Sequence, residues 1–267
     1  MKNEAENFKI TKFKKEGLAL LKGHWLIPVL ITFLGFLATG LVFTLLFPTS
    51  ACLELIRSFL NNQQFDFTDF PISQCWTLLV FTYVFVPVLE MAQLYVYTLL
   101  KKNSENLKFV HFIKGFSFWR KALENFWWKF LWLCIWMILG LLCGMVIVFV
   151  LSRIFLMKDL EMKILVKIAP FIFYFCMIIP FLIKDYQYLL SDFLIAEKPK
   201  TKAAKALNLS GHLTKGYKWK LFCLDLSFLG WDLLCILLPF GSFWLKPYKT
   251  AAKYSAYKFL QKINKES

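Results

Sequence analysis

Charged side chains inside long apolar stretches are the residues of this sequence that could carry chemistry. Asp225 and Asp232 lie seven residues apart, which is two turns of an α-helix, so the spacing predicts both carboxylates on one helical face. With Glu90, Asp185 and Lys253 they form a predicted polar cluster in the cytoplasmic half of one helical bundle. An unpaired charge there costs about 3 kcal/mol even on lenient insertion scales, so these groups are expected to be paired, protonated or hydrated.

Two interpretations of this predicted polar cluster stay open from the sequence. Carboxylates that water can reach would serve an ion or proton path, or a polar pocket open to the cytoplasm. Carboxylates paired with lysine would instead fix how the helices pack, because polar contacts commonly hold membrane helices together.

Metal-dependent and nucleophilic chemistry have little support. His24, His111 and His212 are far apart, and none has a second ligand at helical spacing. The sequence contains no phosphate-binding loop and no HExxH or GxSxG motif, which argues against an ATP-driven motor and the familiar hydrolases. We therefore predict that the protein is not an enzyme and that it holds no metal and no cofactor.

The cysteines fall into two groups. Five lie in apolar stretches, where they act as small apolar side chains; they are Cys134, Cys143, Cys176, Cys223 and Cys235. Cys52 and Cys75 lie in a loop expected outside the membrane, where a disulfide is chemically allowed. Their spacing alone does not fix whether they pair.

The composition indicates a membrane protein. Of 267 residues, 58% are hydrophobic, which exceeds the ~45–50% typical of soluble domains. The formal net charge is nevertheless +15. Because the lysines lie between apolar stretches and not on one globular face, the charge favours contact with anionic lipid of the inner leaflet over nucleic-acid binding.

The apolar stretches predict five clear membrane spans. Each is long enough to cross roughly 30 Å of hydrocarbon, and they are residues 25–47, 76–100, 127–151, 164–190 and 221–238. Lysine-rich connections follow the second and fourth spans, whereas the loops 48–75 and 152–163 carry few lysines. By the positive-inside rule, the N-terminus is expected in the cytoplasm.

Self-similarity predicts three repeated units, residues 1–102, 103–198 and 199–267, within one integral membrane domain over 1–267. Each unit would join a basic interfacial helix to a membrane hairpin, as in Leu21-Lys22-Gly23-His24-Trp25 and Lys215-Gly216-Tyr217-Lys218-Trp219-Lys220. The predicted interfacial anchors are Trp25, Trp127, Trp128, Trp219, Lys218 and Lys220.

Three hairpins require a weaker sixth span at 242–263, which would return the C-terminus to the cytoplasm. Lys246, Lys249 and Lys253 would then form one helical face directed into the bundle. The alternative is a cytoplasmic amphipathic helix that follows a shallow, re-entrant turn at Pro239-Phe240-Gly241. Both readings predict an all-α, polytopic transmembrane bundle.

The last third of the chain resembles a known family. SGHLTKGYKWKLFCLDLSFLGWDLL, SFWLKPY and the opening LALLKGHWLIPVLITFL are similar to bacterial integral membrane proteins grouped as domain of unknown function 975. The resemblance is dense over 206–248 and sparse over the rest of the chain. It implies a membrane topology and no established activity, so it assigns no catalytic residue.

From these observations we expect a multi-pass protein of the cytoplasmic membrane with both termini in the cytoplasm. The expected role is a non-enzymatic scaffold, sensor or envelope-stress factor whose basic interfacial helices bind anionic lipid. The alternative is a small-solute or ion transporter that uses the predicted polar cluster.

Overall fold

Every regular element in the described part of the chain is a helix. The structure, a computed structural model, describes residues 8–46, 72–102, 109–157 and 162–266. Its elements are α2 (Ile10–Leu21), α3 (Leu26–Leu46), α5 (Ile72–Lys102), α6 (Phe109–Phe116), α7 (Trp119–Met157), α8 (Met162–Tyr188), α9 (Ser191–Glu197), α10 (Ala203–Leu213), α11 (Lys218–Leu226), α12 (Leu229–Leu237), the 3-10 helix η3 (Pro239–Gly241) and α13 (Ser242–Glu266). This confirms the predicted all-α class.

The elements form two compact units. The first, here called the hairpin unit, comprises residues 1–10, 124–227 and 256–267, and the second, the elbow unit, comprises 11–123 and 228–255. The boundaries between the units fall inside α2, α7 and α13 and between α11 and α12.

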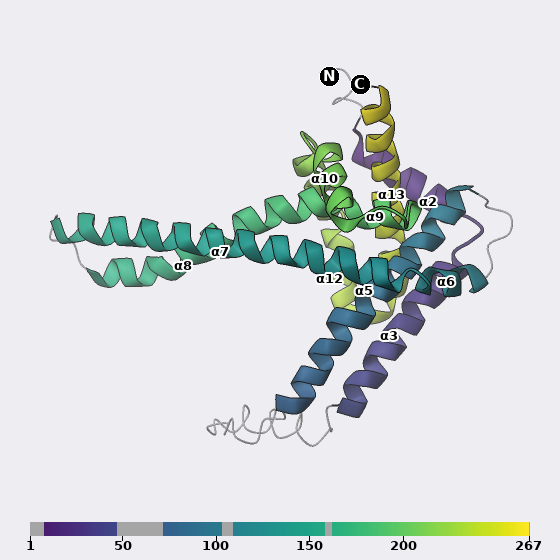
Figure 1. The fold of residues 1–267 in the computed structure, drawn as a ribbon, viewed down its shortest axis with the longest axis horizontal. Helices are drawn as coiled ribbons and strands as arrows, with labels where there is room; N and C mark the ends of the chain where they lie inside the picture. Colours follow the sequence, from purple (N-terminus) through teal and green to yellow (C-terminus); the bar gives the residue numbers. More distant parts are fainter. Residues whose placement is uncertain (1–7, 47–71, 103–108, 158–161, 267) are drawn as a thin grey trace. The chain divides into compact units, whose positions relative to one another are not determined.

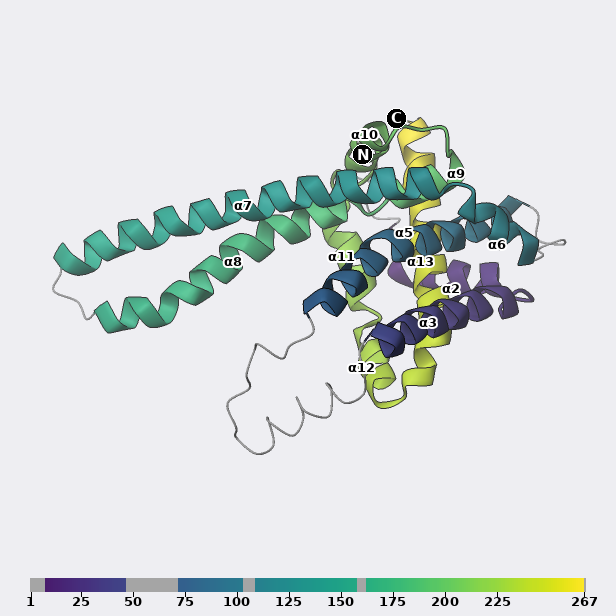
Figure 2. The same ribbon diagram turned by 60° about the horizontal axis from the view of Figure 1, so that its bottom comes forward.

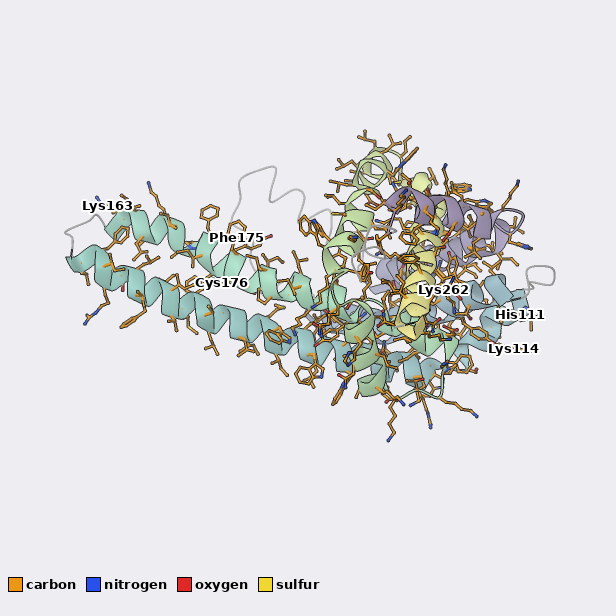
Figure 3. The ribbon with its side chains drawn as sticks, turned by 90° about the horizontal axis from the view of Figure 1, so that it is seen from above. His111, Lys114, Lys163, Phe175, Cys176 and Lys262 are labelled. Carbon is orange, nitrogen blue, oxygen red and sulfur yellow. The ribbon has the colours of Figure 1, made fainter. Side chains whose placement is uncertain are left out.

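The hairpin unit is built on the antiparallel helices α7 and α8, which run side by side (Figures 1 and 2). They approach closely at Gly140, where an added Cβ would meet the backbone of Cys176. Figure 3 shows Cys176 on the side of α8 that faces α7, whereas Phe175 points away from it. Most other side chains along the hairpin are exposed apolar groups, as lipid-facing helices require.

The short helices α9 and α10 follow the C-terminal end of α8 and complete the hairpin unit. The Ser210 hydroxyl of α10 donates to the Gln187 carbonyl at 2.7 Å and accepts from the Leu190 N–H at 3.2 Å. Asp192 of α9 accepts from Asn125 at 2.6 Å and forms an ion pair with Lys129 at 2.9 Å. The Ser210 bonds satisfy backbone groups where α8 ends, and the Asp192 contacts join α9 to α7 through side chains.

The elbow unit takes its name from the sharp turn between α2 and α3, whose axes differ by 93°. Gly23 makes this turn with φ +82°, a conformation that L side chains rarely adopt. α2 buries Phe13, Gly17 and Leu21 on one face. Gly17 meets α13 so closely that a Cβ there would lie 2.8 Å from the Ala252 nitrogen.

α3 and α5 pack side by side in the elbow unit (Figures 1 and 2). The Gln93 amide donates to the Thr32 hydroxyl at 3.0 Å, and Gln93 is buried. The fully buried Tyr97 donates to the Pro247 carbonyl of α13 at 3.3 Å. Interhelical hydrogen bonds of this kind fix helix packing in an apolar environment.

The structure supports fewer membrane spans than the sequence predicts. Three helices in the described residues are long and apolar enough to cross a membrane, at Leu79–Leu100, Trp119–Leu156 and Lys163–Glu197; a fourth is gained if α2 and α3 count as one bent span. The predicted fifth span, 221–238, is instead broken between α11 and α12, each nine residues long. Five clear spans are therefore not confirmed.

The reason for this break lies in tertiary packing. Phe228, at the junction, is fully buried, with its ring 5.1 Å from that of Tyr248 and with the Lys14 ammonium 4.3 Å above it. Nine residues of helix rise only ~13 Å, less than half of the ~30 Å of hydrocarbon. Neither α12 nor α13 is among the candidate spans found in the described residues.

Candidate functional site

The predicted polar cluster is divided between the two units. Glu90, Asp232 and Lys253 belong to the elbow unit, whereas Asp185 and Asp225 belong to the hairpin unit. The expected shared face of Asp225 and Asp232 is wrong, because the helix that would carry both ends at Leu226 and a new one begins at Leu229. The two groups are therefore described separately.

In the elbow unit, each carboxylate has a lysine partner from α13. Lys249 donates to both oxygens of Asp232, at 3.0 and 2.8 Å. Lys246 lies 3.5 Å from Glu90. The sequence grouped these acids with Lys253 and did not predict their pairing with Lys246 and Lys249, although the lysine spacing on α13 was the signal for it.

The three α13 lysines line one cavity. Lys246, Lys249 and Lys253 are spaced i, i+3 and i+7, and all three border a cavity of about 340 Å³ together with Asp232, Ser242 and Thr250. This places them on one face of α13, as the sequence predicts. We call these three residues the lysine row.

Neither ion pair is sealed from solvent. The side chains of Lys249 and Asp232 are 26% and 40% exposed, and those of Lys246 and Glu90 are 48% and 53% exposed. Partly exposed pairs contribute roughly 0–1 kcal/mol each, so the carboxylates can exchange lysine partners or ligands at small cost. Nearby, burial raises the pKa of the Tyr248 phenol, which stays protonated and uncharged.

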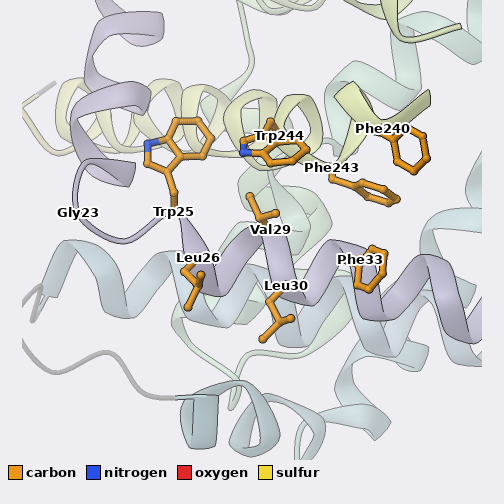
Figure 4. Close-up of a pocket in the computed structure, with 9 residues that line it drawn as sticks. All are labelled: Gly23, Trp25, Leu26, Val29, Leu30, Phe33, Phe240, Phe243 and Trp244. Atoms are coloured by element: carbon orange, nitrogen blue, oxygen red, sulfur yellow. The ribbon is translucent and has the colours of Figure 1, made fainter. Parts of the chain in front are cut away.

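An apolar cavity lies in the same unit. It has a volume of about 800 Å³ and is bordered by Gly23, Trp25, Leu26, Val29, Leu30, Phe33, Phe240, Phe243 and Trp244. Figure 4 shows α3 along one side, with Phe33 beneath Phe243 at one end and Trp25 at the other. The Phe33 and Phe243 rings meet edge to face at 5.3 Å. The volume falls within the ~300–1,000 Å³ of small-molecule sites.

A second apolar cavity, of about 390 Å³, shares lining residues with the first cavity and with the lysine cavity. It shares Trp25 and Trp244 with the large cavity and Cys235 and Leu245 with the lysine cavity. The three cavities are therefore neighbours beside α12, η3 and the first turns of α13. The sequence does not predict the two apolar cavities, because their walls come from segments more than 200 residues apart.

In the hairpin unit, Asp225 accepts a hydrogen bond from the Tyr186 hydroxyl at 3.0 Å. This bond joins α11 to α8. Lys218 donates to Gln187 at 2.9 Å, and burial, followed by the nearby Lys184, lowers the pKa of the Lys218 ammonium. Asp225 thus contributes a packing contact between these two helices through Tyr186.

The predicted interfacial anchors occupy different settings. Trp127, Trp128 and Trp219 are exposed, as membrane-interface anchors would be. Trp25 is half-buried at the elbow, and Lys220 lies 5.6 Å from the Tyr217 ring. Trp127 and Trp128 lie within the continuous helix α7 and not at a helix junction; the break before this span falls earlier, at 117–118 between α6 and α7.

The remaining predictions concern the cysteines and metal binding. The Cys52–Cys75 pairing falls on side chains outside the described residues. The five remaining cysteines are free thiols. Within the described ranges, no three His, Cys, Asp or Glu side chains gather closely enough to hold a metal ion.

A family model described as "Protein of unknown function (DUF975)" matches residues 7–264. No curated protein and no solved structure matches the sequence significantly. The match covers both units, including the lysine row and the apolar cavities.

Proposed function

Because the chain belongs to the DUF975 family, whose function is unknown, we propose its role from physical features: a non-enzymatic, multi-pass protein of the cytoplasmic membrane. It acts as a scaffold, sensor or envelope-stress factor, and its basic interfacial helices bind anionic lipid of the inner leaflet. Both termini lie in the cytoplasm. The apolar helices support the membrane setting, while the lipid preference and the orientation are our inference.

The observation that carries this proposal is the elbow between α2 and α3. α2 buries Phe13, Gly17 and Leu21, and it leaves Lys12 and Lys15 exposed on the opposite side. The chain then turns by 93° into an apolar helix. A basic amphipathic helix at a right angle to an apolar one suits a helix that lies on a bilayer and leads into a span.

Charge supports the choice of lipid. The chain has 32 basic and 17 acidic residues. Basic residues close to an anionic leaflet each contribute about 1 kcal/mol of attraction, and this attraction falls with salt. Lysines near the elbow would therefore favour the inner leaflet.

The test uses the full chain in nanodiscs of phosphatidylcholine with or without phosphatidylglycerol. We expect the anionic lipid to raise the melting temperature, and 500 mM salt to remove most of that rise. The variant Lys15→Gln/Lys22→Gln should lose most of it, whereas Lys15→Arg/Lys22→Arg, which keeps the charge, should retain it. A melting temperature that is indifferent to lipid charge would contradict the proposal.

A transporter is the second candidate, favoured by the Asp232–Lys249 pair at the edge of a cavity. Ion-pair exchange is a known device for coupling transport to a charge. Asp232→Asn in proteoliposomes separates the two roles. A transporter would lose proton or ion flux at an unchanged melting temperature, whereas a packing pair would show a lower melting temperature and no flux in either protein.

A further inference from the structure

We propose that a cavity between α8 and α11 in the hairpin unit holds one anionic phospholipid, with its phosphate at Lys218 and an acyl chain against α8. This inference rests on the proposed membrane setting and deepens the lipid preference, because it adds one discrete site to a diffuse attraction. The elbow that carries the proposed function belongs to the other unit, so the two proposals can be tested separately.

The cavity has a volume of about 330 Å³ and lies where α11 packs against α8. One wall is a stripe of α8 side chains at the i, i+3, i+4 and i+7 spacing of a single helical face: Ile179, Leu182, Ile183 and Tyr186. The other wall is the start of α11, where the Trp219 and Phe222 rings stack with their centroids 5.0 Å apart. Aliphatic and aromatic walls of this kind suit an acyl chain, and the volume falls within the ~300–1,000 Å³ of small-molecule sites.

The cavity is open to the surroundings of the hairpin unit. Its α8 wall belongs to the candidate membrane span Lys163–Glu197. Ile183 on this wall is 49% exposed, and Trp219 on the other wall is 72% exposed. Exposed apolar side chains beside a span face acyl chains in a bilayer. An acyl chain of the surrounding lipid can therefore enter the cavity from the side.

The charge that borders the cavity belongs to Lys218, the first residue of α11. Its ammonium donates to the neutral Gln187 amide at 2.9 Å, which uses one of its three N–H groups. Burial, and then the nearby Lys184 ammonium, lower the pKa of the Lys218 ammonium. Lys184 itself lies 4.0 Å above the Trp136 ring. Both lysines thus contact neutral groups, and an anion beside them would relieve their mutual repulsion.

Within the described residues, neither of these two lysines forms an ion pair with a carboxylate. Asp225 accepts a hydrogen bond from the Tyr186 hydroxyl at 3.0 Å. Asp185 follows Lys184 on α8, and adjacent residues of a helix do not face each other. The first turn of α11 contains no acidic residue. The phosphate of a lipid would therefore not displace a carboxylate from Lys218.

The polarity of α8 along the cavity matches the depth profile of a lipid. The helix is apolar from Ile179 to Ile183 and becomes polar over residues 184–188, Lys-Asp-Tyr-Gln-Tyr. The bond between Lys218 and Gln187 lies at this polar end, and the helix rises about 12 Å from Ile179 to Gln187. A phosphate at Lys218 thus leaves its acyl chain along the apolar wall. A zwitterionic headgroup would bring its own ammonium close to two lysines, so the site favours an anionic headgroup.

The experiment is native mass spectrometry of the full chain in mild detergent, with phosphatidylglycerol or phosphatidylcholine added. We expect one phosphatidylglycerol to be retained, and phosphatidylcholine to be retained several-fold more weakly. Lys218→Gln should weaken retention about fivefold, the effect of one lysine close to anionic lipid, whereas Lys218→Arg keeps the charge and should retain the lipid. Ile183→Trp should also weaken retention, because its indole occupies the cavity and leaves Lys218 in place.

Two matched controls should retain the lipid. Lys215→Gln removes the same charge from an exposed side chain that lies three residues before Lys218 and does not border the cavity. Ile168→Trp adds the same indole at an exposed position of α8 outside the cavity. Melting temperatures identify any variant that fails to fold.

Equal losses for Lys215→Gln and Lys218→Gln would mean that the attraction is only diffuse, which would overturn the site. Full retention by Ile183→Trp, equal retention of phosphatidylcholine, or displacement by inorganic phosphate at millimolar concentration would each overturn it as well. The nanodisc response of the α2 variants is a separate measurement on the elbow unit, so the site can fail while the proposed function stands.

Discussion

At the scale of single residues, two members of the predicted polar cluster, Glu90 and Asp232, form ion pairs of unequal quality. The Asp232–Lys249 pair has two short contacts and is less exposed than the Glu90–Lys246 pair, whose atoms are 3.5 Å apart. Shorter, better-shielded pairs couple more strongly, because water and salt screen them less.

Double-mutant cycles should reveal this difference. Asp232→Asn with Lys249→Met should give a coupling of about 1 kcal/mol, against a few tenths for Glu90→Gln with Lys246→Met, following measured exposed and partly exposed pairs. The measurement is reversible unfolding in detergent. Equal coupling free energies would mean that solvent screens both ion pairs to the same extent, which would contradict this prediction.

Glycines provide a second residue-scale prediction. Gly17→Ala should destabilise the protein by about 1–3 kcal/mol, since its Cβ would lie 2.8 Å from backbone of Ala252 that has little room to move. Gly40→Ala is the control, because that position in α3 faces open space and should gain up to about 1 kcal/mol of helix propensity. Thermal unfolding of both variants tests the contact between α2 and α13. A neutral Gly17→Ala would show that this contact relaxes freely.

At the scale of elements, hydropathy predicted the long apolar helices, because their signal is local and extends over many residues. It failed at residues 221–238, where the mean is apolar but the helix breaks beside the buried Phe228. At that break Phe228 contacts Tyr248 and Lys14, which are distant in sequence. Local pattern could not reveal it.

The candidate site shows the same contrast between features within one helix, which the sequence predicts, and features between helices, which it does not. The lysine row was visible as i, i+3, i+7 spacing within one helix. The large apolar cavity was not visible in the sequence, because α3 and α13 must first meet to form it. Both Gly23 and Gly216, which the sequence compared as junctions, have φ near +80°. The corresponding segment of the second predicted unit, Asn125-Phe126-Trp127-Trp128-Lys129, has no glycine and lies inside α7. Two of the three predicted repeats therefore share a glycine with positive φ at the start of the hairpin.

At the scale of the whole molecule, the number of crossings decides the sidedness. Four crossings, like six, return both termini to the same face, so a cytoplasmic C-terminus fits either count. The two counts differ at the Pro239–Gly241 turn. Six crossings would expose this turn outside, whereas a re-entrant hairpin would not.

Labelling of intact cells tests this difference. Ser242→Cys should react with a membrane-impermeant maleimide only after the cells are opened, beyond the background of the parent protein. Two reporters are fused after Ser267, one that is active only in the cytoplasm and one that is active only after export. Only the first should be active. Labelling of Ser242→Cys from outside would restore the six-crossing topology, and an exported C-terminal reporter would contradict both.

The length of α7 has a mechanical consequence. Its candidate span, Trp119–Leu156, contains 38 residues, which rise about 57 Å, nearly twice the thickness of the hydrocarbon layer. Such a rod must tilt, stretch the surrounding bilayer or leave part of itself outside, and each response depends on how thick the membrane is. A cell that shortens or lengthens its fatty acids would therefore change the inclination of this arm, and with it the strain on the protein.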